Sequence, residues 1–161
     1  MSWLLHRIDD RLIHGQVLVA WGARLHPVRM WLVDDAVAAS EWERRVYEEA
    51  APGIEVHVVD VATAAAEHAG EARATGGAFL LVRDLGSARR LVEAGAAVRE
   101  FNVGGLHYAP GKDKVGEYVY LDAADREHAR ALLARGVALE VRDVPASRSV
   151  PLASLDAAVQ P

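Results

Sequence analysis

The chain has 161 residues, enough for one domain, here residues 1–161, with a sizeable apolar core. Apolar residues make up 52% and charged residues 25% of the composition, and a net charge of −5 argues against nucleic acid as a partner. The absence of cysteine excludes disulfides and thiol catalysis, and no apolar run approaches the roughly 20 residues that a membrane helix needs.

Strand patterns and helix patterns alternate along the chain. Apolar runs typical of buried strands lie at 3–8, 29–33, 54–59, 78–82, 98–103 and 137–141. Helical spacing of apolar residues occurs near 15–25, 38–50, 61–74, 86–94 and 123–135. This alternation predicts a three-layer α/β/α fold around an open twisted sheet whose strands are mostly parallel. The first strand follows no basic leader, so we expect a cytoplasmic protein.

Some local patterns predict where elements begin and where the alternation breaks. Two helices carry a capping-box spacing at their start, Ser40 with Glu43 and Asp122 with Asp125. Residues 104–121 depart from the alternation, because glycine and proline pairs there are typical of loops. A further short strand at 117–121 need not be parallel to its predecessor, so we expect one antiparallel strand near the C-terminal half. The tail from residue 145 is expected to pack along the surface.

Residues 7–17 read Arg-Ile-Asp-Asp-Arg-Leu-Ile-His-Gly-Gln-Val and join the first predicted strand to the first predicted helix. They place His14 and Gly15 at the start of that helix and at the carboxyl end of a strand, where open α/β sheets hold their ligands. A helix N-terminus favours an anion, and Arg11 adds donors suited to phosphate oxygens. A neutral His14 ring in this setting is a candidate nucleophile toward phosphorus.

The acidic pair before Arg11 bears on the state of that ring. Asp9 or Asp10 could fix its tautomer by accepting the other ring proton. Taken singly, a histidine near a helix start is more often a cap or a surface residue, so the segment carries the prediction as a whole. The seven histidines show no pair at helical ligand spacing, and we therefore expect no metal.

As a whole, the 7–17 segment resembles the opening of the IIB component of the mannose/fructose/sorbose class of the bacterial sugar phosphotransferase system. Later segments resemble that family in the same order, namely 32–38, 51–56, 101–106, 111–112 and 134–137. The similarity covers essentially residues 1–157. It implies a mostly parallel α/β fold with the active histidine in the loop after the first strand.

The resemblance also implies roles for residues and partners. His14 would receive a phosphoryl group from a phosphohistidine on a IIA domain and pass it to a sugar held by a IIC/IID membrane complex, as a protein-histidine-dependent sugar phosphotransferase. Arg11, Gly15 and Gln16 would bind the phosphoryl group, and Asp9 would orient Arg11 or the ring. Loops that could approach the site carry Asp35, Asp84, Asn102, Gly104 and Gly105. The resemblance implies no cofactor, a location beside the membrane transporter, and allows a homodimer.

The chain departs from the family after the fourth predicted strand. The family commonly has a hydroxyl or amide residue there, whereas this chain reads Val-Arg-Asp-Leu-Gly-Ser at 82–87. If this loop borders the phosphoryl group, Asp84 adds a negative charge that repels it. The two glycines at 104 and 105 have a simpler interpretation as residues that allow a tight turn with positive φ.

Two other functions stay open on the sequence. One is a regulatory phosphotransfer protein without transport, which neighbouring genes for membrane components would separate from a transporter. The other is an α/β module that binds an anionic metabolite without chemistry. Acid-labile phosphate after incubation with a phosphorylated IIA domain would separate this module from both phosphocarriers.

Overall fold

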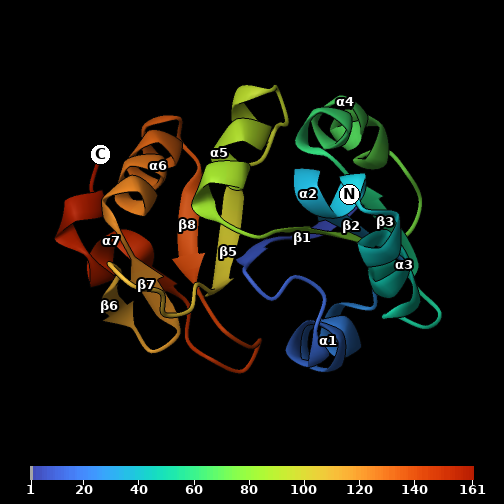
Figure 1. Cartoon of the computed structure of the whole chain (residues 1–161), viewed down its shortest axis with the longest axis horizontal. Coiled ribbons are helices and arrows are strands. Elements are labelled where there is room, and N and C mark those ends of the chain that lie inside the picture. Colours follow the sequence, from blue (N-terminus) through green and yellow to red (C-terminus); the bar gives the residue numbers. More distant parts are fainter. Residues whose placement is uncertain (1) are drawn as a thin grey trace.

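The computed structural model describes residues 2–161, which contain one seven-stranded sheet and one two-stranded sheet (Figure 1). The large sheet has the order β3-β2-β4-β1-β5-β8-β9. Its strands are β1 (Trp3–Asp9), β2 (Arg29–Val33), β3 (Glu55–Val59), β4 (Ala78–Val82), β5 (Glu100–Gly105), β8 (Ala138–Val141) and β9 (Val150–Pro151). All adjacent strands pair in parallel except the short edge strand β9, which is antiparallel to β8. The expected mostly parallel sheet is confirmed.

Helices cover both faces of the large sheet. They are η1 (Val17–Gly22), α1 (Ala23–Leu25), α2 (Asp35–Ala39), α3 (Glu41–Glu49), α4 (Val61–Glu71), α5 (Leu85–Glu93), α6 (Ala123–Ala134), α7 (Leu152–Leu155) and η2 (Ala157–Val159). One apolar core lies under α4, α5 and α6, and a second core includes side chains of η1, α2 and α3. Figure 1 shows α4, α5 and α6 above the sheet and α1 below it. β4 is buried along its whole length because both of its faces are covered, as its continuous apolar run predicts.

Two expected helices differ from the predictions. The helix expected at 38–50 is interrupted at Ser40, whose backbone is extended and whose hydroxyl accepts the N–H of Glu43 at 3.3 Å. A serine that caps one helix ends the preceding one, because its side chain competes for backbone groups. The helix that begins after His14 contains six π-helical residues, Val17–Gly22. The capping box of Asp122 and Asp125 is confirmed, with both reciprocal bonds present.

Residues 104–121 differ from the expectations in part, whereas the tail agrees with them. Gly104 and Gly105 belong to β5 and have no positive φ, so the prediction of a glycine turn there is wrong. The expected antiparallel strand is β7 (Val119–Leu121), which pairs with β6 (Asp113–Gly116) in the small sheet. The tail forms β9, α7 and η2 and packs along the surface as expected, with most residues partly or fully exposed and with Leu152 and Val159 completely buried.

The topology creates a crevice between the carboxyl ends of β1 and β5. These two strands are neighbours, but the chain leaves β1 toward β2 on one side and leaves β5 toward β8 on the other. The two connections therefore diverge, and such a switch point is where open α/β sheets bind ligands. The same divergence occurs between β2 and β4. The fold thus offers two crevices, both at the carboxyl ends of the parallel strands.

Candidate functional site

A buried arginine lies under the crevice between β1 and β5. Arg7 is fully buried in β1 and donates through Nη2 to Asp9 Oδ2 at 3.0 Å. Its Nη1 donates to Asn102 Oδ1 of β5 and to the carbonyl of Arg142. Burial lowers the pKa of Arg7, and the carboxylate of Asp9 works against that shift. A Cβ at Gly104 would overlap the Arg7 guanidinium, so a residue without a side chain is needed there.

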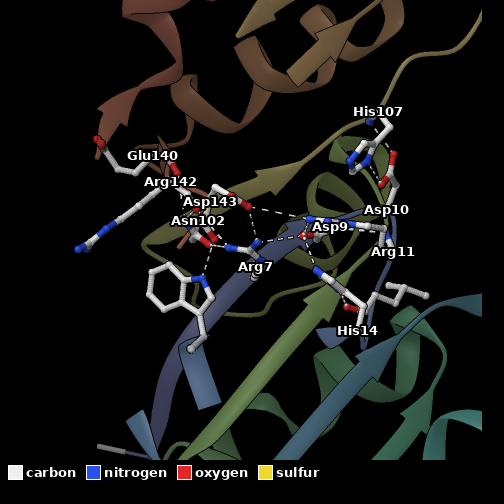
Figure 2. Close-up of polar contacts among 12 residues, drawn as sticks. Arg7, Asp9, Asp10, Arg11, His14, Asn102, His107, Glu140, Arg142 and Asp143 are labelled. Carbon is white, nitrogen blue, oxygen red and sulfur yellow. Dashed lines mark hydrogen bonds and ion pairs between the residues drawn. The ribbon is translucent and has the colours of Figure 1, made fainter. Parts of the chain in front are cut away.

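Asp9 is the hub of the site and links Arg7 to Arg11 (Figure 2). Its buried carboxylate accepts the backbone N–H of Arg11 at 3.1 Å and the Nε and Nη2 of Arg11 at 3.0 Å each. Burial alone raises the pKa of Asp9, but hydrogen bonds from Arg11 and the charge of Arg7 bring it below its ordinary value. Asp9 is therefore ionised and fixes the orientation of Arg11.

Arg11 is the cation of this group that reaches solvent. Its side chain is 33% exposed, whereas those of Arg7 and Asp9 are 0% exposed. The hydrogen bond to Asp9 raises the pKa of Arg11, with burial opposing it. Asp9 uses Nε and Nη2, and Nη1 has no hydrogen-bond partner among residues 2–161. Arg11 is thus a permanently charged, preoriented donor for an anion.

His14 lies beside the same carboxylate. Its Nδ1 is 2.9 Å from the carbonyl of Leu12, and its Nε2 is 3.7 Å from Asp9 Oδ2. A carbonyl oxygen only accepts, so Nδ1 carries a proton in this conformation. The expectation that Asp9 or Asp10 fixes the tautomer of His14 by accepting a ring proton is wrong. The carbonyl of Leu12 accepts the Nδ1 proton, Asp9 lies beyond hydrogen-bond distance of Nε2, and Asp10 bonds His107 instead.

The helix after His14 presents its first turn to solvent. Gly15 and Gln16 are exposed, and the carbonyl of His14 accepts the N–H of Leu18 at 3.2 Å. Leu12 has a positive φ of 55°, a backbone conformation that is rare for a branched side chain and marks the tight return before His14. The first N–H groups of a helix have no partner within the helix, which suits them to an anion.

Sequence reasoning missed three residues that complete the site. Arg7 is the buried cation described above, and Asp143 Oδ1 lies 3.9 Å from its Nη2 and 4.0 Å from Nη2 of Arg11. Trp21 donates from Nε1 to the Asp143 carbonyl at 2.8 Å, and its ring centroid is 5.6 Å from Cζ of Arg7. An arginine inside the first predicted strand was the available sign, since a buried charge requires partners.

The expected loop residues divide between the two crevices. Asn102, Gly104 and Gly105 lie at the β1/β5 crevice, and a Cβ on Gly105 would meet Arg11 Nη2 at 3.1 Å. Asp35 instead accepts the N–H of Val61 at 2.9 Å and pairs with Arg90.

Asp84 also belongs to the region of the second crevice. It begins α5 and accepts the N–H of Ser87 at 2.7 Å, while the preceding Arg83 binds Asp34 at 2.9 Å. No hydrogen bond or ion pair within the described chain joins Asp84 to residues 9–14. The carboxylate of Asp84 is used as a helix cap.

Unmet hydrogen-bonding capacity is concentrated at the β1/β5 crevice. In the part of the chain that the structure describes, three buried side-chain atoms lack a hydrogen-bond partner: Arg7 Nε, His14 Nε2 and Asp143 Oδ1. All three belong to this one site. Buried polar atoms without partners are costly, so their gathering indicates a place built to meet a polar ligand. Residues 2–161 contain no cluster of three side chains able to hold a metal ion.

Fold and site together define a doubly wound α/β protein whose switch point holds a histidine beside a fixed arginine. A model of the family described as the PTS system sorbose subfamily IIB component matches residues 3–159. The chain is 40% identical over 141 residues to the mannose-specific EIIAB component of the PTS of Escherichia coli K12, covering 87% of this chain and 44% of that protein. It is 34% identical over 151 residues to the sorbose-specific EIIB component of Klebsiella pneumoniae, covering 93% of this chain and 92% of that protein. The crystal structure of the IIB domain of the Klebsiella pneumoniae sorbose permease has a TM-score of 0.87 at 33% identity, over 96% of both chains.

The chain therefore belongs to the sorbose subfamily of PTS IIB components. It spans less than half of the length of the mannose-specific relatives, since the match covers 44% of them. Among residues 2–161, no helix combines the length and the apolar character that crossing a membrane requires.

Proposed function

We propose that this domain is a phosphohistidine carrier of a sugar phosphotransferase system. His14 accepts a phosphoryl group from a phosphohistidine of a IIA domain and donates it to a sugar at a IIC/IID membrane complex, at the cytoplasmic face of the membrane. The observation that carries the proposal is the triad of Asp9, Arg11 and His14, in which Asp9 fixes Arg11 by three hydrogen bonds next to the ring. Membership in the IIB family supports it.

The transfer needs little covalent chemistry from the protein. The N–P bond of the donor histidine breaks while an N–P bond to His14 forms, and the donor imidazole leaves. In the second step the N–P bond to His14 breaks while an O–P bond to a sugar hydroxyl forms, the His14 imidazole leaves, and the hydroxyl proton ends, in the net reaction, on that imidazole. Positioning and stabilisation of spread negative charge supply most of the catalysis. Arg11 and the N–H groups at Gly15 and Gln16 supply that stabilisation.

The His14 ring turns before it meets a phosphoryl group. In the observed conformation Nε2 is buried against Asp9, and Nδ1 is bonded to the carbonyl of Leu12. A phosphoryl group on Nε2 in this position would lie against the Asp9 carboxylate, which is repulsive. Rotation of the side chain frees either nitrogen and brings the ring toward Arg11 and the helix start.

The test is phosphorylation by a phosphorylated IIA domain, followed by analysis of acid-labile phosphate. We expect labelling of the native domain and complete loss in His14→Ala with the melting temperature nearly unchanged. The matched control is His128→Ala, another partly buried histidine, whose ring lies 3.5 Å from Arg89 and far along the chain from the site. Labelling that survives in His14→Ala would refute the assignment. Anion binding by the native domain without any labelling would indicate the non-catalytic module instead.

A further inference from the structure

A second histidine lies at the rim of the same crevice. His107 follows β5, and Asp10 follows β1, where its backbone N–H donates to the carbonyl of Gly105 at 3.0 Å. The backbone N–H of His107 donates to Asp10 Oδ2 at 2.7 Å, and the ring Nδ1 is 2.6 Å from Asp10 Oδ1 (Figure 2). Residue 107 therefore holds both oxygens of the Asp10 carboxylate and ties the loop that carries Arg11 to the end of β5.

The ring of His107 closes on the charged centre of the site. A Cβ placed on Gly105 would lie 2.9 Å from Cε1 of His107, 3.1 Å from Nη2 of Arg11 and 3.3 Å from Oδ1 of Asp9. The three groups thus converge on the space above one glycine. The side chains of His107 and Asp10 are 41% and 31% exposed, so their charges act on the site from its solvent side.

We propose that His107 is a positioning residue for phosphoryl transfer, because its imidazolium neutralises Asp10 and keeps that carboxylate from repelling the phosphoryl group beside Arg11. The inference rests on the proposed phosphocarrier function and deepens it. An unpaired carboxylate next to a phosphoryl group lowers the stability of the phosphorylated form.

Charged side chains from several segments lie near His107. Asp10 binds the ring directly, and Arg11 and Asp9 meet it above Gly105. Lys112, on the loop that follows His107, lies within electrostatic reach of Asp10 but donates to Asp125 at 2.8 Å. Lys112 is held by Asp125, and Arg11 is bonded to Asp9 through Nε and Nη2, so His107 is the group that bonds Asp10 directly.

If His107 acts through its charge, phosphoryl transfer depends on pH without movement of a loop. Histidine is the side chain that ordinarily changes charge between about pH 5 and pH 8. A neutral ring still donates its Nδ1 proton to Asp10, and the backbone N–H bond from residue 107 is unaffected. Deprotonation therefore keeps the geometry and exposes one negative charge next to the phosphoryl site.

Two variants separate charge from structure. His107→Asn keeps a side-chain donor for Asp10 but carries no charge, and His107→Lys stays charged throughout pH 5.5–8.5. His128→Asn is the matched control. The measurements are the rate constant at saturating phosphorylated IIA, the half-saturating IIA concentration and the phosphorylation equilibrium at each pH, with melting temperatures for every variant.

We expect the native domain to hold its phosphoryl group about two- to fivefold better at low pH than His107→Asn, the size of one partly exposed charge pair. The difference disappears at high pH, and His107→Lys keeps the low-pH behaviour throughout. Equal profiles for the native domain and His107→Asn overturn the proposal, as does a native pH step that persists in His107→Lys. Those outcomes leave labelling at His14 intact, whereas failure of the phosphocarrier function appears as an unlabelled native domain.

Discussion

Two networks of buried charge lie at opposite ends of the parallel strands, one at the amino-terminal ends and one at the carboxyl-terminal ends. They differ in how completely their polar atoms are bonded. At the amino-terminal ends of the strands, Glu71 of α4 accepts hydrogen bonds from Arg29 of β2, the shortest at 2.7 Å. Ser2 Oγ donates to the same carboxylate at 2.6 Å, and Trp31 Nε1 donates at 3.3 Å. Arg29 also donates to the carbonyl of Thr75 at 2.7 Å. No side-chain atom of this network is among the buried unpaired atoms of residues 2–161.

At the carboxyl-terminal ends of the strands, Asp9 accepts three hydrogen bonds from the guanidinium groups of Arg7 and Arg11, as many as Glu71 accepts from Arg29, and a fourth from the backbone N–H of Arg11. The difference is that Arg7, His14 and Asp143 each keep one buried polar atom without a partner in the described chain. A fully bonded network stabilises the fold and has nothing left to offer a ligand. The comparison therefore teaches that unmet hydrogen bonding at a switch point, rather than buried charge as such, distinguishes the functional network.

The substitution expected to have the largest effect is Arg11→Ala, which removes a cation from the network at Asp9. Phosphoryl transfer from IIA should fall by about 100-fold or more, because the partly exposed cation that Asp9 holds beside His14 is lost. The stability loss should stay at about 1–2 kcal/mol, since Asp9 keeps its bond to Arg7. Arg11→Lys should restore transfer only in part, because a point charge lacks the two-pronged geometry. Rapid-quench transfer kinetics check this, with Arg45→Ala on the exposed surface as control; an unchanged rate in Arg11→Ala would contradict it.

Glu71→Ala should have the opposite signature. It leaves Arg29 without its carboxylate and should lower the free energy of unfolding by about 3 kcal/mol, or roughly 10 °C in melting temperature. Transfer per folded molecule should equal that of the native domain, because the Glu71 network lies at the opposite end of the strands from His14. Urea unfolding and transfer assays at low temperature measure the two quantities. A fall in transfer with unchanged stability would contradict the structural role of Glu71.

The two glycines of β5 should separate stability from transfer within one site. Gly104→Ala should cost about 1–3 kcal/mol, because the new methyl group overlaps the buried guanidinium of Arg7, which cannot move aside freely. Gly105→Ala meets the flexible ends of Arg11 and His107 and should cost less stability but slow transfer about tenfold by displacing Arg11. Thermal unfolding and transfer rates of both variants provide the test. A reversed order of the two stabilities would contradict the packing described here.

Like the two charge networks, the histidines include structural and functional members, and His6 is a structural one. His6 is packed against Trp3 and Phe101, with Nε2 2.9 Å from Nε2 of His68. Burial, and secondarily the charge of His68, lowers the pKa of His6 to about 3. Since an unfolded histidine titrates near pH 6.5, this stabilisation is complete above about pH 6.5 and is lost as pH falls toward 3.

His6→Gln should therefore reduce the acid-side slope of stability by up to about 1.4 kcal/mol per pH unit, the value for one proton. The amide can keep a hydrogen bond to His68 while it removes the titration. Urea midpoints between pH 4 and pH 7 measure the slope, and His128→Gln is the control. Identical slopes for the native domain and His6→Gln would show that another group controls acid unfolding.

Much of the fold follows from local patterns, and those parts could be predicted. The apolar runs at 29–33 and 78–82 became β2 and β4 because central parallel strands are buried on both faces. The 7–17 segment could be interpreted because strand, loop and helix are contiguous there. Asp9, Arg11 and His14 lie close together for the same reason, because they belong to one short continuous segment.

The parts that escaped prediction depend on contacts between distant segments. Arg7 reaches Asn102, 95 residues away, and Trp21 reaches the carbonyl of Asp143, 122 residues away. No local pattern encodes such pairs. Ser40 divides a helix that has continuous helical periodicity, because a side-chain cap outcompetes the pattern. Leu152 of the tail is buried because it joins the core under α6, which depends on where β8 and β9 bring it.

Asp84→Thr should have the smallest effect and marks the boundary between the two crevices. The family pattern made Asp84 a candidate for repelling the phosphoryl group, but its carboxylate accepts the N–H of Ser87 and begins α5. Threonine caps helices almost as well, so the stability should change by about 0.5 kcal/mol or less. The phosphorylation equilibrium with IIA should stay within about twofold of the native value at low salt, because the charge that is lost is one already engaged at a helix start. A shift of tenfold toward the phosphorylated form, diminishing as salt is added, would show that the field of Asp84 reaches His14 from the neighbouring crevice. In that event the two crevices would act as one electrostatic site, and Arg83, which is held by Asp34, would be the next side chain to vary.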